Sequence, residues 1–215
     1  MGKILTLEGC TGVGKSTQMR VLTEQILNKG FKIAPINELD YEPCKSVVHT
    51  WRTSELGRKK LYTWQVVQDM ANARLQVHNE ILTPLLKNVN FILLDRSYIT
   101  NAIYQSDSGF SPYKIIELHK RMGVLPIDRG YILDCPPELS FDRAYNRNLS
   151  EFEEGGGFEF ERKRFMIPVE KLEDIQKRHL LYREITGKYP ELKIINSNRV
   201  QDEITQDIVA DILTL

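Results

Sequence analysis

The sequence of 215 residues lacks the features that mark several large classes of protein. It has only three cysteines, far apart and without a C-x-x-C pair, so neither a disulfide framework nor a zinc site is expected. No apolar run approaches the ~18 residues of a membrane span, and the first apolar run begins too early to follow a secretory signal. Basic and acidic residues number 29 each, so net charge does not indicate nucleic acid or a membrane as a partner. We therefore expect a cytoplasmic protein with no nucleic acid and no membrane as a partner.

A glycine-rich motif stands near the start of the chain. Residues 9–16 read Gly-Cys-Thr-Gly-Val-Gly-Lys-Ser, which matches the phosphate loop G-x-x-x-x-G-K-[ST]. The motif follows an apolar run at 4–7 and precedes a helical pattern at 17–29, the strand–loop–helix context that such a loop requires. Its glycines let backbone N–H groups surround phosphate oxygens at a helix N-terminus, where the dipole favours anions. The loop is expected to bind a nucleoside triphosphate, ATP, through Gly12, Val13, Gly14, Lys15, Ser16 and Thr17.

Two side chains of this motif have expected chemical roles. Lys15 would reach the β- and γ-phosphates, and the hydroxyl of Ser16 would ligate Mg²⁺. A glycine-rich turn without a ligand would leave the Lys-Ser order unexplained. ATP and Mg²⁺ are therefore the expected cofactors.

Strand-like and helical patterns alternate along the chain. Short runs rich in Ile, Leu, Phe or Tyr predict strands at 3–7, 31–36, 90–94, 130–133 and 192–195. Apolar residues with a 3.6-residue period predict one long helix over about 61–86. Continuous apolar strands separated by helices indicate a parallel sheet covered on both faces. We predict a three-layer α/β fold with a five-stranded parallel sheet, forming a single domain over 1–215.

Ligands in such sheets bind outside the carboxyl ends of the strands, which directs attention to Glu38, Asp95 and Arg96. Asp95 could hold Mg²⁺ directly or through water, and Arg96 offers a planar fork for a second phosphate group. An ordinary surface ion pair is the alternative for these two residues. The chain lacks the N-K-x-D pattern of GTPases and the consecutive carboxylates of motor ATPases, so a small-molecule kinase is the expected class.

A charged stretch with three consecutive glycines covers 146–164. It is either a solvated loop or a mobile lid, about 143–165, that closes over a polyphosphate; we expect the lid. Arg143 and Arg147 lie one turn apart on the preceding helix and could reach the transferring phosphoryl group as arginine fingers.

The segment Asp-Arg-Ser-Tyr-Ile-Thr-Asn-Ala-Ile-Tyr-Gln at 95–105 resembles the Asp-Arg-Tyr-x-x-Ser-Asn-x-x-Tyr segment of thymidylate kinases. Arg74, ten residues before Pro84, and the Leu-Asp-Cys-Pro-Pro-Glu run at 133–138 follow the order of the same family. The resemblance extends from Ile4 to the last helix. It implies a phosphate-loop kinase fold, ATP-dependent phosphorylation of dTMP or a close deoxynucleoside monophosphate, and a homodimer.

The resemblance also implies roles for single residues. Arg74 would hydrogen-bond the thymine ring, Asn101 would contact its edge, and Tyr104 would pack at the 2′ position of the sugar. Arg96 would grip the acceptor phosphate, and Glu38 would lie near it. Each of these residues could instead have a purely structural role. Arg74 could be a solvated helix residue, Asn101 could cap a helix, and Tyr104 could pack in the core. Glu38 could be a turn residue, in which case Glu42 could lie near the acceptor phosphate in its place.

Two expected substrate-binding positions depart from the family pattern. Thr11 stands where the family carries Asp or Glu, which contacts the sugar of the acceptor or its metal. Met70 stands where the family has an aromatic side chain that stacks on thymine, although Met is polarizable and can cover a base.

Two other functions remain open at this point. In related deoxynucleoside kinases a Glu at the position of Glu38 is the general base for a sugar 5′-hydroxyl. A nucleotide-binding regulatory protein without catalytic activity is the second alternative, because Thr11 lacks the carboxylate.

Overall fold

In the computed structural model of the protein, residues 2–153 and 170–215 are described, of which 147–153 are described only as helical backbone. Five parallel strands form one sheet in the order β2-β3-β1-β4-β5. The five strands predicted from the sequence are present, with each end within two residues of its predicted place: β1 (Lys3–Glu8), β2 (Ile33–Ile36), β3 (Phe91–Asp95), β4 (Arg129–Asp134) and β5 (Leu192–Asn196).

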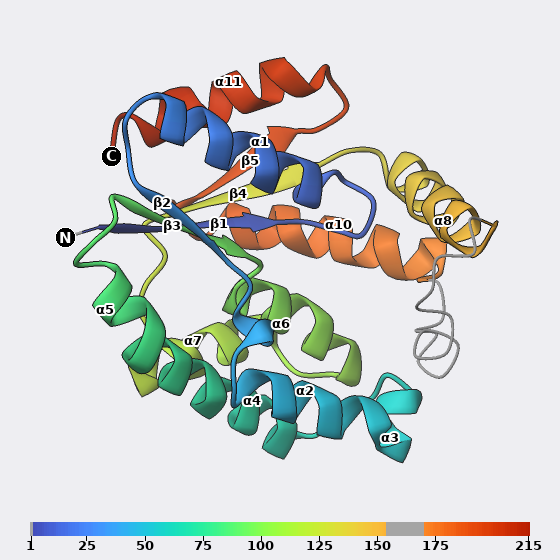
Figure 1. Cartoon of the computed structure of the whole chain (residues 1–215). Coiled ribbons are helices and arrows are strands. Elements are labelled where there is room, and N and C mark those ends of the chain that lie inside the picture. The colour runs from blue at the N-terminus through green and yellow to red at the C-terminus, as the bar shows by residue number, and fades with distance from the viewer. Residues whose placement is uncertain (1, 154–169) are drawn as a thin grey trace.

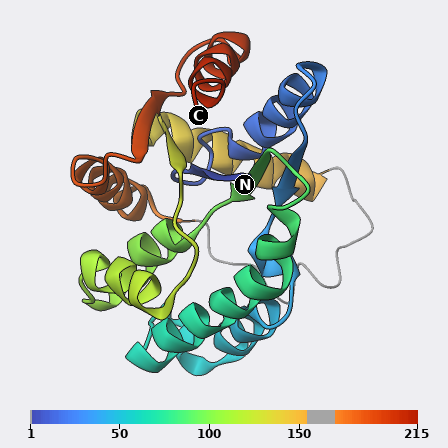
Figure 2. The ribbon, with the colours of Figure 1, turned by 90° about the vertical axis from the view of Figure 1, so that its left-hand side faces the viewer.

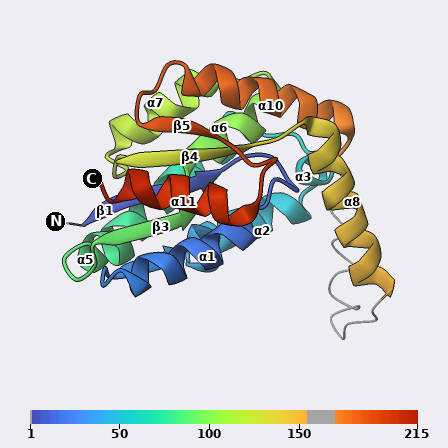
Figure 3. The same cartoon turned by 90° about the horizontal axis from the view of Figure 1, so that it is seen from above.

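Helices cover both faces of the sheet, which confirms the three-layer α/β prediction (Figures 1 and 2). One face carries α1 (Lys15–Asn28) and α11 (Gln201–Ile212), which lie side by side above the strands in Figure 1 and in front of them in Figure 3. The opposite face carries α4 (Trp64–Val77), α6 (Tyr98–Gln105), α7 (Pro112–Met122) and α10 (Leu172–Thr186). Helix α2 (Cys44–Thr53) packs on α4, α3 (Glu55–Arg58) packs on α2, and α8 (Pro137–Glu153) follows β4. Within the described ranges, no helix is both long enough and apolar enough to cross a membrane.

Local sequence signals account for several helix ends. Gly14 precedes α1 in the left-handed conformation, with a φ of 99°, which a side chain with a Cβ adopts at a cost. The side chain of Ser97 caps α6 by accepting a hydrogen bond from the N–H of Ile99. Pro112 occupies the first turn of α7, where its missing N–H would have no partner, and Gly123 follows the helix with a φ of 87°.

The long helix predicted over 61–86 is interrupted, contrary to expectation. Helix α4 ends at Val77, a π-helical turn η2 covers His78–Leu82, and α5 covers Thr83–Leu85. Pro84 has no N–H to give to the carbonyl four residues earlier, and its ring crowds that carbonyl, which accounts for the wider turn before it. A periodic pattern of apolar residues does not reveal such a widening, because η2 still buries His78 and Leu82.

The register of the central strands assembles the site. Strand β1 pairs with β3 so that Leu7 lies opposite Asp95, and with β4 so that Glu8 lies opposite Ile132. The phosphate loop that leaves β1 therefore starts between the carboxyl ends of β3 and β4. This is the edge of the sheet that the sequence predicted for ligand binding.

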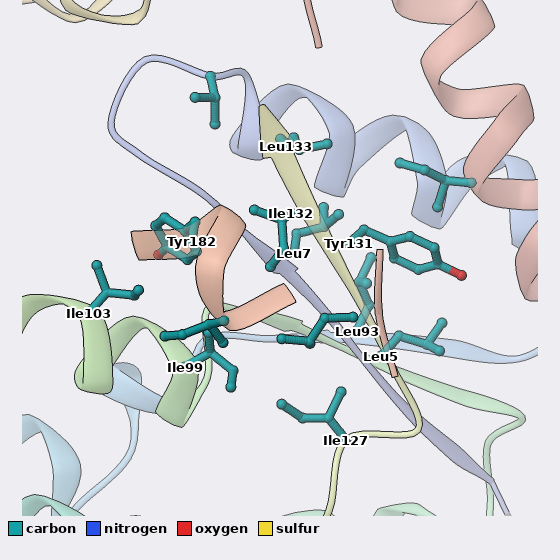
Figure 4. Packing of buried hydrophobic residues seen from close by; sticks show 14 of the residues in the cluster. Leu5, Leu7, Leu93, Ile99, Ile103, Ile127, Tyr131, Ile132, Leu133 and Tyr182 are labelled. Atoms are coloured by element: carbon teal, nitrogen blue, oxygen red, sulfur yellow. The ribbon is translucent and has the colours of Figure 1, made fainter. Parts of the chain in front are cut away.

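A hydrophobic core on both faces of the sheet holds these strands in place (Figure 4). Leu5, Leu93 and Tyr131 lie on three neighbouring strands, and Tyr131 points toward α11, where its hydroxyl donates to Oδ2 of Asp211 at 3.0 Å. Ile99 of α6 and Tyr182 of α10 cover the opposite face. All five side chains are buried, and full burial of such a side chain contributes ~1.5–3 kcal/mol each. The residues at the strand ends are thus mounted on a rigid support.

Candidate active site

The phosphate loop has room only for glycine at two positions. A Cβ on Gly12 would lie 1.9 Å from the carbonyl oxygen of Ser140, and a Cβ on Gly9 would lie 2.5 Å from that of Leu133. Both glycines have positive φ angles, 85° and 129°. The loop therefore packs its backbone directly on β4 and on the first turn of α8, which fixes its shape.

Lys15 points back into the loop that precedes it. Its Nζ donates hydrogen bonds to the carbonyl oxygens of Gly9, at 3.0 Å, and Cys10, at 2.6 Å. Burial and the nearby charge of Arg96 lower the pKa of Lys15 to about 7. A buried ammonium group beside a second cation gains stability from an anion, so this position suits a phosphate group.

Ser16 and Asp95 are the two residues predicted to hold Mg²⁺. Asp95 is the last residue of β3, and its charge acts on Lys15 to raise the pKa of that amine. Ser16 is exposed on the first turn of α1. A hydroxyl and a carboxylate are hard oxygen ligands, and Mg²⁺ commonly takes only one or two protein ligands beside phosphate oxygens and water. The donor set fits Mg²⁺; the described residues contain no cluster of three or more His, Cys, Asp or Glu side chains for a metal held by protein alone.

Arg96 has a backbone conformation that is rare for a residue with a side chain. Its φ is 71°, in the left-handed region, which costs ~1–2 kcal/mol. Its Nη1 donates hydrogen bonds to the carbonyl oxygen of Gly9, at 3.3 Å, and to Oγ1 of Thr100, at 3.2 Å. The guanidinium group thus lies against the backbone at the start of the phosphate loop.

Glu8, which was not singled out from the sequence, holds the Arg96 turn in place. Its Oε1 accepts hydrogen bonds from the N–H of Ser97, at 2.7 Å, and from Oγ of Ser97, at 2.6 Å. Its Oε2 accepts one from Oγ1 of Thr100 at 2.5 Å. Burial raises the pKa of Glu8, although these hydrogen bonds and Arg96 act in the opposite direction. A charged residue at the carboxyl end of a mostly apolar strand was the one available signal for this role.

Arg74 and Glu38, predicted as separate substrate contacts, form one buried ion pair. Nε of Arg74 donates to Oε2 of Glu38 at 2.8 Å, and the two residues are 2% and 1% exposed. Oε1 of Glu38 lies 2.5 Å from Nε2 of His78, and Nη1 of Arg74 lies 3.3 Å from Nε2 of His119. Arg74 is therefore not a solvated helix residue, and neither histidine had been predicted to take part.

The negative charge of the Glu38 carboxylate is well stabilised. Burial alone would raise the pKa of Glu38, but the Arg74 charge and the His78 hydrogen bond outweigh burial and hold the pKa below its ordinary value. Met70, one turn before Arg74 on α4, is also buried and packs with Cys44 and Val77.

Tyr104 lies between two arginines. Its ring centre is 5.6 Å from Cζ of Arg96 and 4.0 Å from Cζ of Arg178, distances typical of cation–π contacts. Arg178, on α10, also donates a hydrogen bond of 2.5 Å to Oδ2 of Asp107. Arg178 was missed because nothing in the sequence around it links α10 to α6.

Asn101 is half-buried in the middle of α6, and it is not the cap of that helix, because Ser97 is. Thr11 is half-buried in the phosphate loop, and Arg143 is exposed on α8. The backbone of Arg147 belongs to α8, but its side chain and most of the predicted lid lie outside the described residues.

His119 makes the stability of this region depend on pH. Burial, and next the charge of Arg74, lower the pKa of His119 to about 3. Below pH 6.5 an unfolded chain protonates this histidine while the folded chain does not, so stability is lost as pH falls from 6.5 toward 3. Between pH 7 and pH 5, protonation of His119 in the unfolded chain lowers the free energy of unfolding by roughly 2 kcal/mol, at ~1.4 kcal/mol per pH unit.

We expect His119→Gln to remove that part of the acid sensitivity. Melting temperatures of the two proteins at pH 7 and pH 5 measure it, and the drop on acidification should be several degrees smaller in the variant. An equal drop in both proteins would show that His119 protonates in the folded state.

Comparison with known proteins agrees with this geometry. The sequence model of the family described as thymidylate kinase matches residues 7–208. A protein named probable thymidylate kinase from Thermococcus kodakarensis is 27% identical over 98% of this chain and 97% of its own length. The thymidylate kinase of Desulfotalea psychrophila is 25% identical over 100% of this chain and 96% of its own length. The thymidylate kinase of Afipia carboxidovorans is 31% identical over 68% of this chain and 64% of its own length. With a family match over nearly its whole length, a parallel sheet and an intact phosphate loop, the chain belongs to the thymidylate kinase family of nucleoside monophosphate kinases.

Proposed function

We propose that the protein transfers the γ-phosphoryl group of ATP to dTMP, or to a close deoxynucleoside monophosphate, and releases the diphosphate. The observation that carries this proposal is the meeting of two cations on one backbone atom. Nζ of Lys15 and Nη1 of Arg96 both donate to the carbonyl oxygen of Gly9, at 3.0 and 3.3 Å. Two positive charges so close together favour two anionic groups, one from the donor and one from the acceptor.

Transfer between two phosphate groups requires positioning and charge neutralisation more than covalent chemistry. Lys15 would hold the β- and γ-phosphates of the donor, with the backbone N–H groups of Gly12, Val13, Gly14, Ser16 and Thr17 around them. Arg96 would hold the acceptor phosphate, in line with the γ-phosphoryl group. Its fixed turn, held by Glu8, would orient it before substrate binds.

Mg²⁺ would be held by Ser16 and Asp95, and when bound it supplies positive charge beside the donor phosphates. Arg143 and Arg147 would approach the transferring group from α8 when a lid over about 143–165 closes. Arg74, Met70, Asn101, Tyr104 and Thr11 would surround the base and sugar of the acceptor. A homodimer in the cytoplasm completes the proposal by analogy with the family.

The state of Glu38 weighs against the nucleoside-kinase alternative. A general base must accept a proton from a sugar hydroxyl and must be within reach of it. Both oxygens of Glu38 are occupied by Arg74 and His78, and its pKa is held below the ordinary value. A phosphate acceptor needs no such base. The regulatory alternative has less support, because Lys15, Ser16 and Arg96 are all present.

A panel of acceptors tests the proposal. Purified protein with ATP and Mg²⁺ is given dTMP, dUMP, dCMP, dGMP or thymidine, and formation of ADP is followed with a coupled enzyme assay. We expect turnover with dTMP and background with thymidine. Turnover confined to nucleosides would support the nucleoside kinase, and background with every acceptor would support the regulatory protein.

A further inference from the structure

The guanidinium group of Arg74 is held from two sides by elements that are distant in the sequence. Glu38, in the short helix η1 (Glu38–Asp40) after β2, accepts from Nε at 2.8 Å. His119, on α7, lies 3.3 Å from Nη1 and is completely buried. His78, in the π-helical turn after α4, holds the other oxygen of Glu38 at 2.5 Å. We call Arg74, Glu38, His78 and His119 the Arg74 network.

Each histidine of the Arg74 network has its protonated nitrogen fixed by a backbone group. Nδ1 of His119 lies 2.8 Å from the carbonyl oxygen of Ile115, so it carries the hydrogen and Nε2 is free to accept from Arg74. Nδ1 of His78 accepts from the N–H of Leu125 at 3.1 Å, so Nε2 carries the hydrogen that it donates to Glu38. The donors and acceptors therefore agree in direction along the whole chain of contacts.

Neighbouring elements also limit movement of the Arg74 network. The ring of His119 stacks on Tyr98 of α6, with centroids 5.5 Å apart and planes at 24°. His78 is 1% exposed and joins η2 to the segment at Leu125. Apart from Arg74, the described charged group that faces these histidines is Glu38.

Two of the five N–H bonds of Arg74 are used in this way. In the described part of the chain, its other three make no hydrogen bond. A guanidinium group only donates, so whatever meets these three N–H bonds must accept. A base whose carbonyl oxygen meets these N–H bonds, such as thymine or uracil through O4, satisfies that requirement. The amino group at the same edge of cytosine or adenine is a donor and does not.

We propose that Glu38, His78 and His119 are positioning residues that hold Arg74 in one orientation, and that the base preference of the proposed function depends on them. This inference rests on the proposed function, because it assigns the specificity of the same site. A side chain whose orientation is fixed in advance loses less freedom when the substrate binds. It also cannot turn away from a mismatched base, and buried donors left without an acceptor are costly, which is a strong source of discrimination.

His119→Leu tests the inference, because it removes the acceptor for Nη1 while retaining an apolar side chain beside Tyr98. Steady-state kinetics with dTMP and dCMP should show a KM for dTMP raised ~10-fold and a kcat within about twofold of the original, since base contacts distant from the reacting atoms bind ground and transition states alike. The preference for dTMP over dCMP, as the ratio of kcat/KM values, should fall by a similar ~10-fold factor.

His119→Gln is the conservative partner, because its side-chain oxygen can again accept from Arg74. The His119→Gln protein should have a KM for dTMP and a base preference within about threefold of those of the original protein. Gln206→Leu, a similar change from a polar side chain to leucine on the exposed part of α11, is the control and should leave all values unchanged. If His119→Leu does not fold by circular dichroism, His119→Met, which is unbranched and adaptable, takes its place.

The outcomes separate this inference from the proposed function. If the original protein does not phosphorylate dTMP, the proposed function fails. If it does, and a folded His119→Leu protein keeps the KM for dTMP and the base preference, the positioning role is wrong. Equal impairment of the Leu and Gln variants would also overturn it, because the loss would then come from disturbed packing and not from the missing acceptor for Arg74.

Discussion

Lys15→Ala should lower kcat by at least ~10²–10³-fold with dTMP as the acceptor, the size of effect seen when one preorganised donor to a developing charge is removed. The ammonium group of Lys15 is buried and lies within 3.0 Å of two carbonyl oxygens of the loop. It would therefore already be in place when a phosphate group binds beside it. Alanine leaves the loop glycines and the start of α1 intact. The loss should therefore concern the chemical step more than folding.

Steady-state kinetics and the melting temperature of Lys15→Ala check this expectation. Lys29→Ala, at the opposite end of α1 and exposed, is the matched control and should be fully active. A Lys15→Ala protein with near-normal kcat would mean that the phosphate loop does not hold the donor.

Arg96→Ala is expected to lower kcat/KM for dTMP by ~10²–10³-fold while the KM for ATP changes by only a few fold, because the lost contact belongs to the acceptor. Arg96→Lys should recover a small part of the loss, since lysine keeps the charge but not the planar fork. The exposed Arg121→Ala on α7 should behave like the original protein.

Backbone strain must be separated from loss of charge in this experiment. Arg96 has a φ of 71°, which alanine tolerates poorly and glycine tolerates well. Arg96→Gly should therefore be as inactive as Arg96→Ala but melt at a higher temperature. Activity that returned in the glycine variant would show that the backbone conformation matters and the guanidinium group does not.

The fold followed from patterns that are local in the sequence. Each strand is a short apolar run, and the run at 3–7 leads directly into Gly9 and the phosphate loop, so periodicity and the motif together predicted the sheet. The position of Arg96 was also predictable, because an arginine just after a buried parallel strand lies at the edge where ligands bind. The π-helical turn at His78 was not, since it leaves the apolar pattern unchanged.

The buried polar contacts could not be predicted, because each joins residues far apart in the chain. Glu38 and Arg74 are separated by 36 positions, and Glu8 and Ser97 by 89. A histidine such as His119, in the last turn of an amphipathic helix, looks the same in sequence whether it faces solvent or accepts from an arginine. Only the packing of α7 against α4 decides between these cases.

One measurement tests the central claim most directly, which is that a phosphate group accepts the γ-phosphoryl of ATP. The original protein is incubated with ATP, Mg²⁺ and dTMP, and all nucleotides are separated by anion-exchange chromatography. We expect dTDP and ADP to appear in equal amounts and a parallel reaction with thymidine to yield no dTMP. The claim would be contradicted if ADP and inorganic phosphate accumulated without dTDP, or if thymidine were converted to dTMP while added dTMP remained unchanged.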